Sequence, residues 1–470
     1  MTGVSVDIRC YCHGLGDCML LSLPRADGSA FWMLIDCGIH SAARGGADKI
    51  REIVADIAER TGGHIDVIVG THEHWDHLSG FIQAAEAFAS LTVGEVWFSW
   101  AENSADPDAR KLDKYKADTA SALAAASFRM AGVEELKETA KGIDALLGFV
   151  FGAKGEKVRD ARERLRSLAP VVRHLEPGTL APLEGVPAIR VYVLGPPRDP
   201  RLLGIEDILS ETYALGGRSA SAAPLANAFD LNTATLRIDD DPSAPFDGTM
   251  GLPLADLARG KWPEDAATAG FFWSHYFGPE ATGATERDQA WRRIDTDWLA
   301  SSVDLALQLD ARTNNTSLVL ALEIVETGRV LLFAADAQVG NWLSWSQVTF
   351  PATSGRPAQT ADDLLRRTVF YKVGHHGSRN ATRAAALELM DHSALVAFSP
   401  TDESLADKVG WKDFPAPKTS ARLREVTSGR FIQSDAGWIH DSSQPIPIKL
   451  GGALRNIRVE HGKYVDLTLT

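Results

Sequence analysis

One short segment constrains this chain more than any other: the run Thr71-His72-Glu73-His74-Trp75-Asp76-His77 packs five potential metal ligands into six residues. A second cluster, Gly374-His375-His376-Gly377-Ser378, follows much later in the chain. Together the two segments hold five of the 13 histidines, a concentration that chance scatter does not explain. Imidazole and carboxylate side chains in combination suit zinc, manganese or iron. The first expectation is therefore a fold that brings two distant segments together around a cation.

Length and composition permit a large folded body and make some partners less favourable. The chain has 470 residues, of which 45% are hydrophobic and 23% charged, as in ordinary soluble proteins. Its net charge of −14 weakly opposes indiscriminate binding to a polyanion, although a local basic groove for nucleic acid is compatible with it. No run of 18 or more apolar residues occurs, so no membrane partner is expected. No basic segment followed by an apolar stretch opens the chain, and only four cysteines occur; both features favour a cytoplasmic protein.

The hydrophobic pattern places the first cluster at the end of a strand. Residues 4–12 alternate between apolar and other residues, which is the period of a half-buried strand. Residues 47–60 change to a helical period, and Gly62-Gly63 ends that helix. Residues 65–70 are then a short apolar strand, and the histidine cluster follows its C-terminal end directly. Strand ends of this kind are where α/β proteins place their chemistry.

The spacing His-x-His-x-Asp-His in a loop predicts two neighbouring metal positions. His72 and His74 can face one cation, while Asp76 and His77 can face a second one. The pattern differs from the helical metalloprotease motif His-Glu-x-x-His, which would need a histidine where Asp76 stands. Asp336 follows a predicted strand and can bridge the two cations.

The second cluster is expected to complete the site. Either His375 or His376 can bind the second cation, and we predict His375 as the ligand. A water shared by two dications is acidic enough to be hydroxide near neutral pH, which makes it a nucleophile. Asp76 is expected to bind metal and orient that hydroxide, and His376 to supply a proton to the leaving group. Asp36 is interpreted as a residue that orients the metal loop, with an ordinary strand-end turn as an equally good alternative.

These motifs resemble the metallo-β-lactamase fold superfamily, whose signature His-x-His-x-Asp-His is matched by His72, His74, Asp76 and His77. More closely, the chain resembles the branch that contains the hydrolase domain of the DNA-uptake protein ComEC. Further matches to that branch occur in the expected order; they are Gly14-Leu15-Gly16-Asp17, Asp36-Cys37-Gly38, Asn314-Asn315-Thr316-Ser317, Asp336-Ala337 and His375-His376-Gly377-Ser378.

This resemblance implies an α/β fold of the four-layer αβ/βα sandwich type, with the metals at one edge of its two sheets. It also implies a hydrolase that uses zinc, as one or two ions, or manganese. Members of this branch commonly hydrolyse phosphodiesters, so a phosphodiesterase or nuclease is the first hypothesis. The superfamily also cleaves lactones and other esters, which keeps a small-molecule hydrolase as an alternative. A binding protein that retains the fold without turnover is the third hypothesis, and the full ligand set argues against it.

The pattern and the resemblance together divide the chain into five segments. Residues 1–100 are expected to hold the N-terminal half of the fold, 171–200 its central strands and 311–470 its C-terminal half. Residues 101–170, rich in Ala, Lys, Glu and Arg, are predicted as a helical insertion. Residues 201–310, rich in Gly, Pro, Asp and Trp, are predicted as an irregular insertion near the pocket.

One departure from the superfamily concerns the first metal position. Many members supply a further histidine to it from a strand in the middle of the chain. The corresponding strand here ends Val193-Leu194-Gly195-Pro196-Pro197, without a histidine. His174 and His275 could substitute, but ordinary surface or packing contacts are expected for both. The first position would then be held only by two histidines of the first cluster and the strand-end aspartate. We therefore predict weak occupancy there, or a hydrolase that works with one tightly held metal.

Overall fold

The computed structural model describes residues 3–132, 136–151, 156–205, 267, 271, 297–352, 356–409, 411 and 414–470. The chain divides into two compact units. Unit 1 comprises Met1–Ala120, Ala145–Ser219 and Gln308–Thr470, and unit 2 comprises Ser121–Asp144 and Ala220–Leu307. Every residue that the sequence assigns to the metal site lies in unit 1. Most of the insertion predicted at 201–310, including His275, lies outside the described residues.

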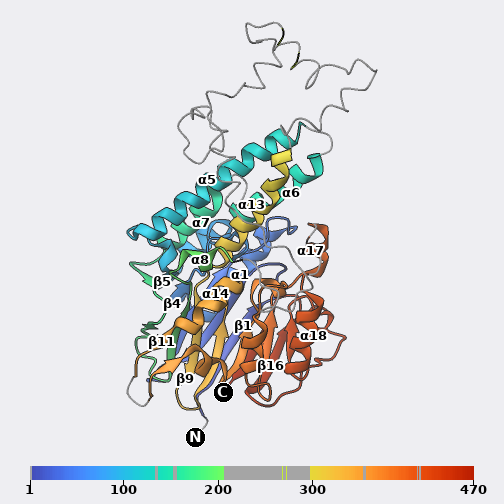
Figure 1. The fold of residues 1–470 in the computed structure, drawn as a ribbon. Helices are drawn as coiled ribbons and strands as arrows, with labels where there is room; N and C mark the ends of the chain where they lie inside the picture. The colour runs from blue at the N-terminus through green and yellow to red at the C-terminus, as the bar shows by residue number, and fades with distance from the viewer. Residues whose placement is uncertain are drawn as a thin grey trace. The chain divides into compact units, whose positions relative to one another are not determined.

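An eight-stranded sheet forms one half of unit 1, in the order β16-β17-β1-β2-β3-β4-β5-β6. Four of its strands, β16, β1, β4 and β5, are labelled in Figure 1. The strands are β1 (Val6–Tyr11), β2 (Cys18–Pro24), β3 (Ala30–Cys37), β4 (His64–Val69), β5 (Thr92–Ser99), β6 (Val171–Leu175), β16 (Leu454–Glu460) and β17 (Tyr464–Leu469). Pairing is antiparallel from β16 to β3 and parallel from β3 to β6. The strands predicted at 4–12 and 65–70 are confirmed as β1 and β4.

A seven-stranded sheet forms the other half, in the order β15-β14-β13-β10-β9-β8-β7. The strands are β7 (Leu180–Ala181), β8 (Ile189–Gly195), β9 (Val319–Ile324), β10 (Arg329–Phe333), β13 (Thr368–Lys372), β14 (Val396–Ser399) and β15 (Phe431–Gln433). Strands β10, β13, β14 and β15 are parallel, and β10 to β7 pair antiparallel. A small separate sheet joins β11 (Thr349–Phe350) to β12 (Gln359–Thr360).

Helices accompany both sheets. Those of the first half of the chain are α1 (Gly46–Thr61), α2 (Trp75–Leu78), α3 (Gly80–Gln83), α4 (Ala85–Ala89), α5 (Pro107–Met130), α6 (Lys137–Phe151), α7 (Glu156–Arg166) and α8 (Pro200–Leu203). Those of the second half are α13 (Asp297–Asn314), α14 (Val339–Ser344), α15 (Ala361–Leu365), α16 (Ala384–Leu389), α17 (Glu403–Lys408), α18 (Pro417–Val426) and α19 (Gly437–His440). The 3-10 turns in the described part of the chain are η1 (Trp100–Glu102), η7 (Trp345–Gln347) and η8 (His375–Gly377). Among the described residues, none of these helices has the length and apolarity needed to cross a membrane.

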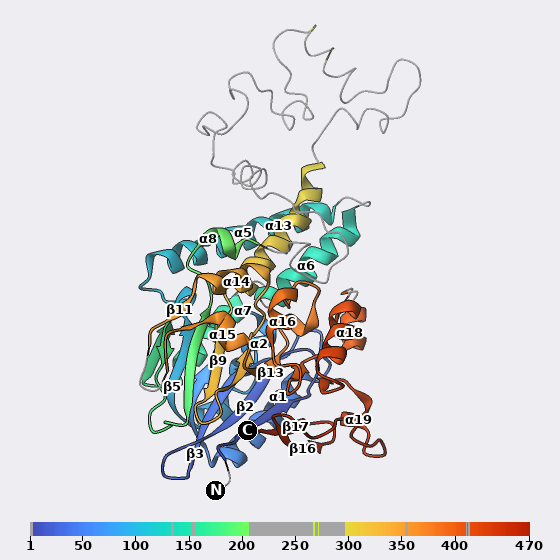
Figure 2. The same cartoon turned by 60° about the horizontal axis from the view of Figure 1, so that its bottom comes forward.

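The two sheets pack face to face because successive side chains of a strand point to opposite faces. On β3, Met33 lies in the core between the sheets, whereas its neighbour Leu34 lies in the outer cluster with the apolar face of α1. On β10, Leu331 lies in the core between the sheets and Leu332 in the other outer cluster, which α14, α15, α16 and α18 complete. Helices α15 and α16 can be followed over the second sheet in Figure 2. The result is the predicted αβ/βα four-layer sandwich.

Candidate metal centre

The predicted ligands come from loops that follow the carboxyl ends of strands in both sheets. In the first sheet, β4 leads into the loop that carries His72–His77. In the second sheet, β10 leads to Asp336, and β13 leads into η8 with His375 and His376. Parallel strands end at the same edge of a sheet, so the loops of each sheet are brought together there. The site therefore lies at one edge of the sandwich, as the sequence predicts.

Two glycines allow other loops to pack directly against the metal loop. A Cβ atom on Gly38 would lie 2.3 Å from the carbonyl carbon and oxygen of Asp76 and 2.4 Å from the amide nitrogen of His77. Gly16, at a φ of 148°, would place a Cβ atom 2.4 Å from the Gly38 oxygen. The Gly38 amide also donates to the carbonyl of Asp17 at 3.0 Å. The Gly-x-Gly-Asp and Asp-x-Gly motifs are thus requirements for close backbone approach.

Asp36 fixes the ring of His77 directly and the ring of His72 through the Thr71 hydroxyl. Its carboxylate accepts hydrogen bonds from the Thr71 amide at 2.9 Å, the Thr71 hydroxyl at 2.6 Å and His77 Nδ1 at 2.8 Å. Since the Thr71 hydroxyl donates to Asp36, it accepts from His72 Nδ1, at 3.1 Å. Both rings therefore carry their proton on Nδ1 and turn Nε2 toward the centre. A carboxylate in this place orients metal-binding imidazoles.

Four buried side chains gather around one half of the centre, which we call the second position: Asp76, His77, Asp336 and His376. His77 Nε2 lies 3.1 Å from Asp336 Oδ2 and 3.7 Å from Asp76 Oδ2. His376 Nε2 lies 2.7 Å from Asp76 Oδ2 and 3.7 Å from Asp336 Oδ2. Its Nδ1 donates to the carbonyl of Pro400 at 2.8 Å, which directs Nε2 inward. Two imidazoles and two carboxylates therefore converge.

Both imidazoles of the second position have raised pKa values. Burial lowers the pKa of His77, but the negative charges of Asp336 and Asp17 outweigh it and hold that pKa well above its ordinary value. For His376, burial also lowers the pKa, and Asp336 together with the hydrogen bond to Asp76 raises it further than burial lowers it. A cation that binds here must displace a proton from each ring, because metal-bound imidazole is neutral.

The first position is formed by His72, His74 and Asp336, which can each offer an atom within 4.8 Å of the others. Burial holds the pKa of His72 well below its ordinary value and lowers that of His74 to about 3. Both rings are therefore neutral near pH 7 and can bind a cation without losing a proton. Asp336 belongs to both positions, where a bridging ligand must lie. On α13, Asp310 places Oδ1 3.9 Å from His74 Nε2, a neighbour that no sequence motif indicated.

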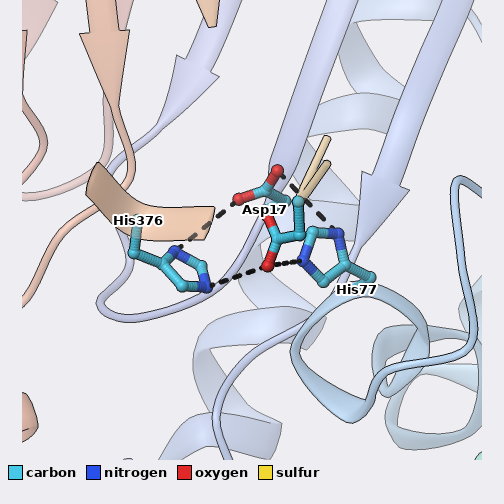
Figure 3. A group of neighbouring side chains, drawn as sticks. Asp17, His77 and His376 are labelled. Carbon is cyan, nitrogen blue, oxygen red and sulfur yellow. Dashed lines mark ion pairs between the residues drawn. The ribbon is translucent and has the colours of Figure 1, made fainter. Parts of the chain in front are cut away.

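An ion pair between Asp17 and Lys372, which the sequence did not predict, borders the centre. Asp17 lies between the rings of His77 and His376, with its oxygens 3.8 Å and 4.0 Å from their Nδ1 atoms (Figure 3). Those Nδ1 atoms already donate to other acceptors, although Asp17 forms with His77, Asp336 and His376 a group that could hold a metal ion. Asp17 forms an ion pair with Lys372, which also contacts Asp336 Oδ1 at 3.2 Å. The Gly-x-Gly-Asp motif was the available signal for Asp17.

The structure places the two histidines of η8 differently from the predicted assignment. His376 joins the second position, whereas His375 lies in neither group of converging ligands among the described residues. His375 Nδ1 accepts from the Gln338 side-chain amide at 3.2 Å and lies 3.0 Å from Ser378 Oγ. Burial lowers the pKa of His375 to about 4. Its ring is thus neutral, with the proton on Nε2.

Backbone strain is concentrated at this site. Among the described residues, five that are not glycine have a positive φ, and four of them carry or flank the predicted ligands. These four are Asp36 at 56°, Ala335 at 48°, His375 at 39° and His376 at 50°. Left-handed conformations cost free energy in residues with a Cβ atom and persist where the surrounding structure holds them. The consecutive left-handed residues of η8 explain why the second histidine, and not the first, faces the centre.

Glu73 lies between His72 and His74 in the sequence, but its side chain forms ion pairs with basic residues instead of joining the metal ligands. Its carboxylate lies 3.4 Å from Arg162 Nη1 and 3.6 Å from Lys116 Nζ, in a buried network that also contains Glu102. Arg162 is on α7 and Lys116 on α5, so this network ties the predicted helical segment to the metal loop. Arg162, one of several basic residues on α7, is therefore a buried ion-pair partner of Glu73 and Glu102. His174, on β6, stacks against Phe98 with ring centroids 6.2 Å apart.

Comparison with known proteins agrees with this geometry. Residues 15–112 match the family model of the metallo-beta-lactamase superfamily. The matched segment includes Gly16 and Asp17 of the first turn, Asp36 and the whole His72–His77 loop. No curated protein matches the chain. The class that the fold and the site define is a metallo-beta-lactamase fold with a buried cluster of histidine and aspartate that could hold metal. Proteins of this superfamily are in general metal-dependent hydrolases.

Proposed function

We propose that this protein is a metal-dependent hydrolase of phosphodiester bonds, a phosphodiesterase or nuclease. The observation that carries the proposal is the convergence of two sets of buried ligands on one shared carboxylate, Asp336. A divalent cation bound there polarises a substrate oxygen and lowers the pKa of a water molecule. Zinc is the first choice and manganese the second, because the ligands are imidazole nitrogens and carboxylate oxygens.

The residues present fit such cations. His72 Nε2 and Asp76 Oδ1 are buried and have no hydrogen-bond partner among the described residues. Buried polar atoms in folded proteins nearly always have partners, so atoms of this kind, aimed at one place, indicate a ligand. The proposed ligands are His72, His74 and Asp336 at the first position and Asp76, His77, Asp336 and His376 at the second. Asp76 would also orient the attacking water.

His375 is proposed as the group that serves the leaving oxygen, in place of the originally predicted His376. His376 has both ring nitrogens engaged, one by Pro400 and the other by Asp76. Among the described residues, the side chains that hydrogen-bond the His375 ring do so at Nδ1, and the amide donor of Gln338 makes that nitrogen the acceptor. The Nε2–H of His375 can then donate to an oxygen that develops negative charge.

The choice of substrate rests on the motif resemblance to the ComEC-like branch. Its Gly-x-Gly-Asp and His-His-Gly-Ser elements correspond to Asp17 and to η8, both of which border the proposed centre. We further propose a cytoplasmic protein, since all four cysteines are buried and unpaired, as expected of a reducing compartment.

The test is an activity panel on protein loaded with zinc or manganese. The substrates are a chromogenic phosphodiester, single- and double-stranded nucleic acids, and a set of lactones. We expect metal-dependent cleavage of the phosphodiesters, lost in Asp76→Ala protein that is equally well folded. Cleavage of lactones alone would favour the small-molecule hydrolase, and metal-independent cleavage would contradict the proposed centre.

A further inference from the structure

Lys372 is a fully buried cation inside a site that is expected to bind cations. It is the last residue of β13, where it pairs in register with Phe333 of β10, three residues before Asp336. Its ammonium group donates to the Ala335 carbonyl at 2.8 Å and to Asp336 Oδ1 at 3.2 Å, and it forms an ion pair with Asp17. Two of the three donor hydrogens of the ammonium group are therefore directed at the turn that carries Asp336, and Asp17 supplies the opposite charge.

The two oxygens of Asp336 have separate surroundings. Oδ1 receives Lys372 Nζ and the backbone amide of His375, the latter at 3.0 Å. Oδ2 faces the Nε2 atoms of His77 at 3.1 Å and His376 at 3.7 Å. The protein therefore holds one oxygen from behind and presents the other to the centre.

Lys372 also holds the backbone of the turn that carries Asp336, through its hydrogen bond to the Ala335 carbonyl. Ala335 has a left-handed φ of 48°, and the hydrogen bond from Lys372 to its carbonyl fixes the peptide group that precedes Asp336. A strained turn of this kind keeps its conformation only where neighbouring groups hold it. Lys372 thus fixes both the backbone and the side chain of the shared carboxylate.

We propose that Lys372 is a positioning residue that holds Asp336 by Oδ1 and so leaves Oδ2 directed at the centre, where a cation could bind it. This inference rests on the proposed metal centre and assigns it a further component. Charge alone does not explain Lys372, because a fixed positive charge beside a ligand carboxylate repels an incoming cation. The geometric contacts are what favour its presence. The alternative is that Lys372 serves only as the counter-ion of buried Asp17.

A double substitution separates position from charge. Lys372→Met alone leaves Asp17 buried without its counter-ion and is expected to destabilise the fold. The double variant Lys372→Met/Asp17→Asn removes both charges, so it should fold like the wild type in a thermal unfolding assay. Lys49→Met, which removes a lysine that donates to the His13 carbonyl, is the control for residue type. Each protein is titrated with zinc in competition with a chromophoric chelator.

We expect the double variant to bind zinc about 10–100-fold more weakly at the first position, with a smaller loss at the second, as observed when residues that orient metal ligands are removed. The first position suffers more because Asp336 is one of only three proposed ligands there. Zinc affinities within about threefold of the wild type at both positions would overturn the inference and leave Lys372 as a counter-ion only. Wild-type protein that binds no zinc at all would instead overturn the proposed metal centre.

Manganese-loaded protein provides a second measurement that fold stability alone does not change. If the Asp336 carboxylate were shared by two bound manganese ions, their spins would couple, and electron paramagnetic resonance would detect the coupling. We expect coupled ions in the wild type and in Lys49→Met protein, and uncoupled signals in the double variant. Undiminished coupling in the folded double variant would contradict a positioning role for Lys372.

Discussion

Substitution of Gly38 by alanine tests whether close backbone packing sets the position of the metal loop. Gly38 is the last residue of the Asp-x-Gly motif, and its backbone touches that of Asp76 and His77. Its φ lies outside the left-handed range, so alanine meets no conformational barrier at this position. The whole effect of the substitution should therefore come from the added methyl group.

The magnitude follows from the contact distances. The new Cβ atom would lie 2.3 Å from the carbonyl group of Asp76, whereas ordinary van der Waals contact begins at 3.4 Å, so the two backbones must separate by about 1.1 Å. Forcing an extra methyl group into a packed region costs about 1–3 kcal/mol of unfolding free energy. A displacement of about 1 Å at a reacting group costs on the order of 10²-fold in rate. We therefore expect a folded protein that has lost most of its activity.

The assay compares kcat/KM on a chromogenic phosphodiester with the denaturant midpoint of each variant. Gly142→Ala is the control, because a Cβ atom there meets no heavy atom within 4 Å and alanine favours the helix that contains it. The control should keep full activity and equal or greater stability. If Gly38→Ala kept wild-type kcat/KM, the metal loop would not depend on this contact and the account of the motif would be wrong.

Three further predictions concern the histidines and their partners. Zinc affinity at the second position should decrease about tenfold per pH unit for each displaced proton as the pH falls, because the raised pKa values of His77 and His376 keep those rings protonated. Calorimetric titration in several buffers counts the displaced protons. A zinc affinity that does not change between about pH 6 and 8 would contradict this prediction. His376→Ala protein should lose the second cation, whereas His375→Ala protein should keep it and lose about 10²- to 10⁴-fold in kcat. Metal analysis of both variants decides between the two histidines. Loss of metal only from His375→Ala protein would restore the assignment of His375 as the ligand. Asp310→Ala should lower the zinc affinity of the first position by about 10–100-fold, because the Asp310 carboxylate orients the His74 ring. A zinc affinity equal to that of the wild type, measured in competition with a chelator, would refute that role.

The ligands could be predicted from the sequence because their order and spacing are local. The four histidines and aspartates of the His-x-His-x-Asp-His run follow directly after an apolar strand, which residues 65–70 were expected to form and β4 provides. Asp336 was recognisable for the same reason, as the first acid after an apolar strand. Periodicity indicated single elements, such as the strand at 4–12 and the helix at 47–60, whereas the layered fold was implied by the resemblance to the metallo-β-lactamase superfamily.

Other parts of the site depend on dihedral angles or on pairing between distant segments. Adjacent His375 and His376 look equivalent in sequence, and the left-handed φ at both positions decides which ring faces inward. Lys372 looks like an ordinary strand end until the parallel pairing of β10 with β13 brings it beside Asp336. Asp310 lies within a helix and has no spacing relation to the motif whose histidine it approaches.

Anomalous diffraction from crystals grown with zinc measures the central claim directly. Two peaks are expected, a strong one among Asp76, His77 and His376 and a weaker one beside His72 and His74, with Asp336 touching both. Zinc bound elsewhere on the molecule, with these side chains still hydrogen-bonded to one another, would contradict the proposed centre.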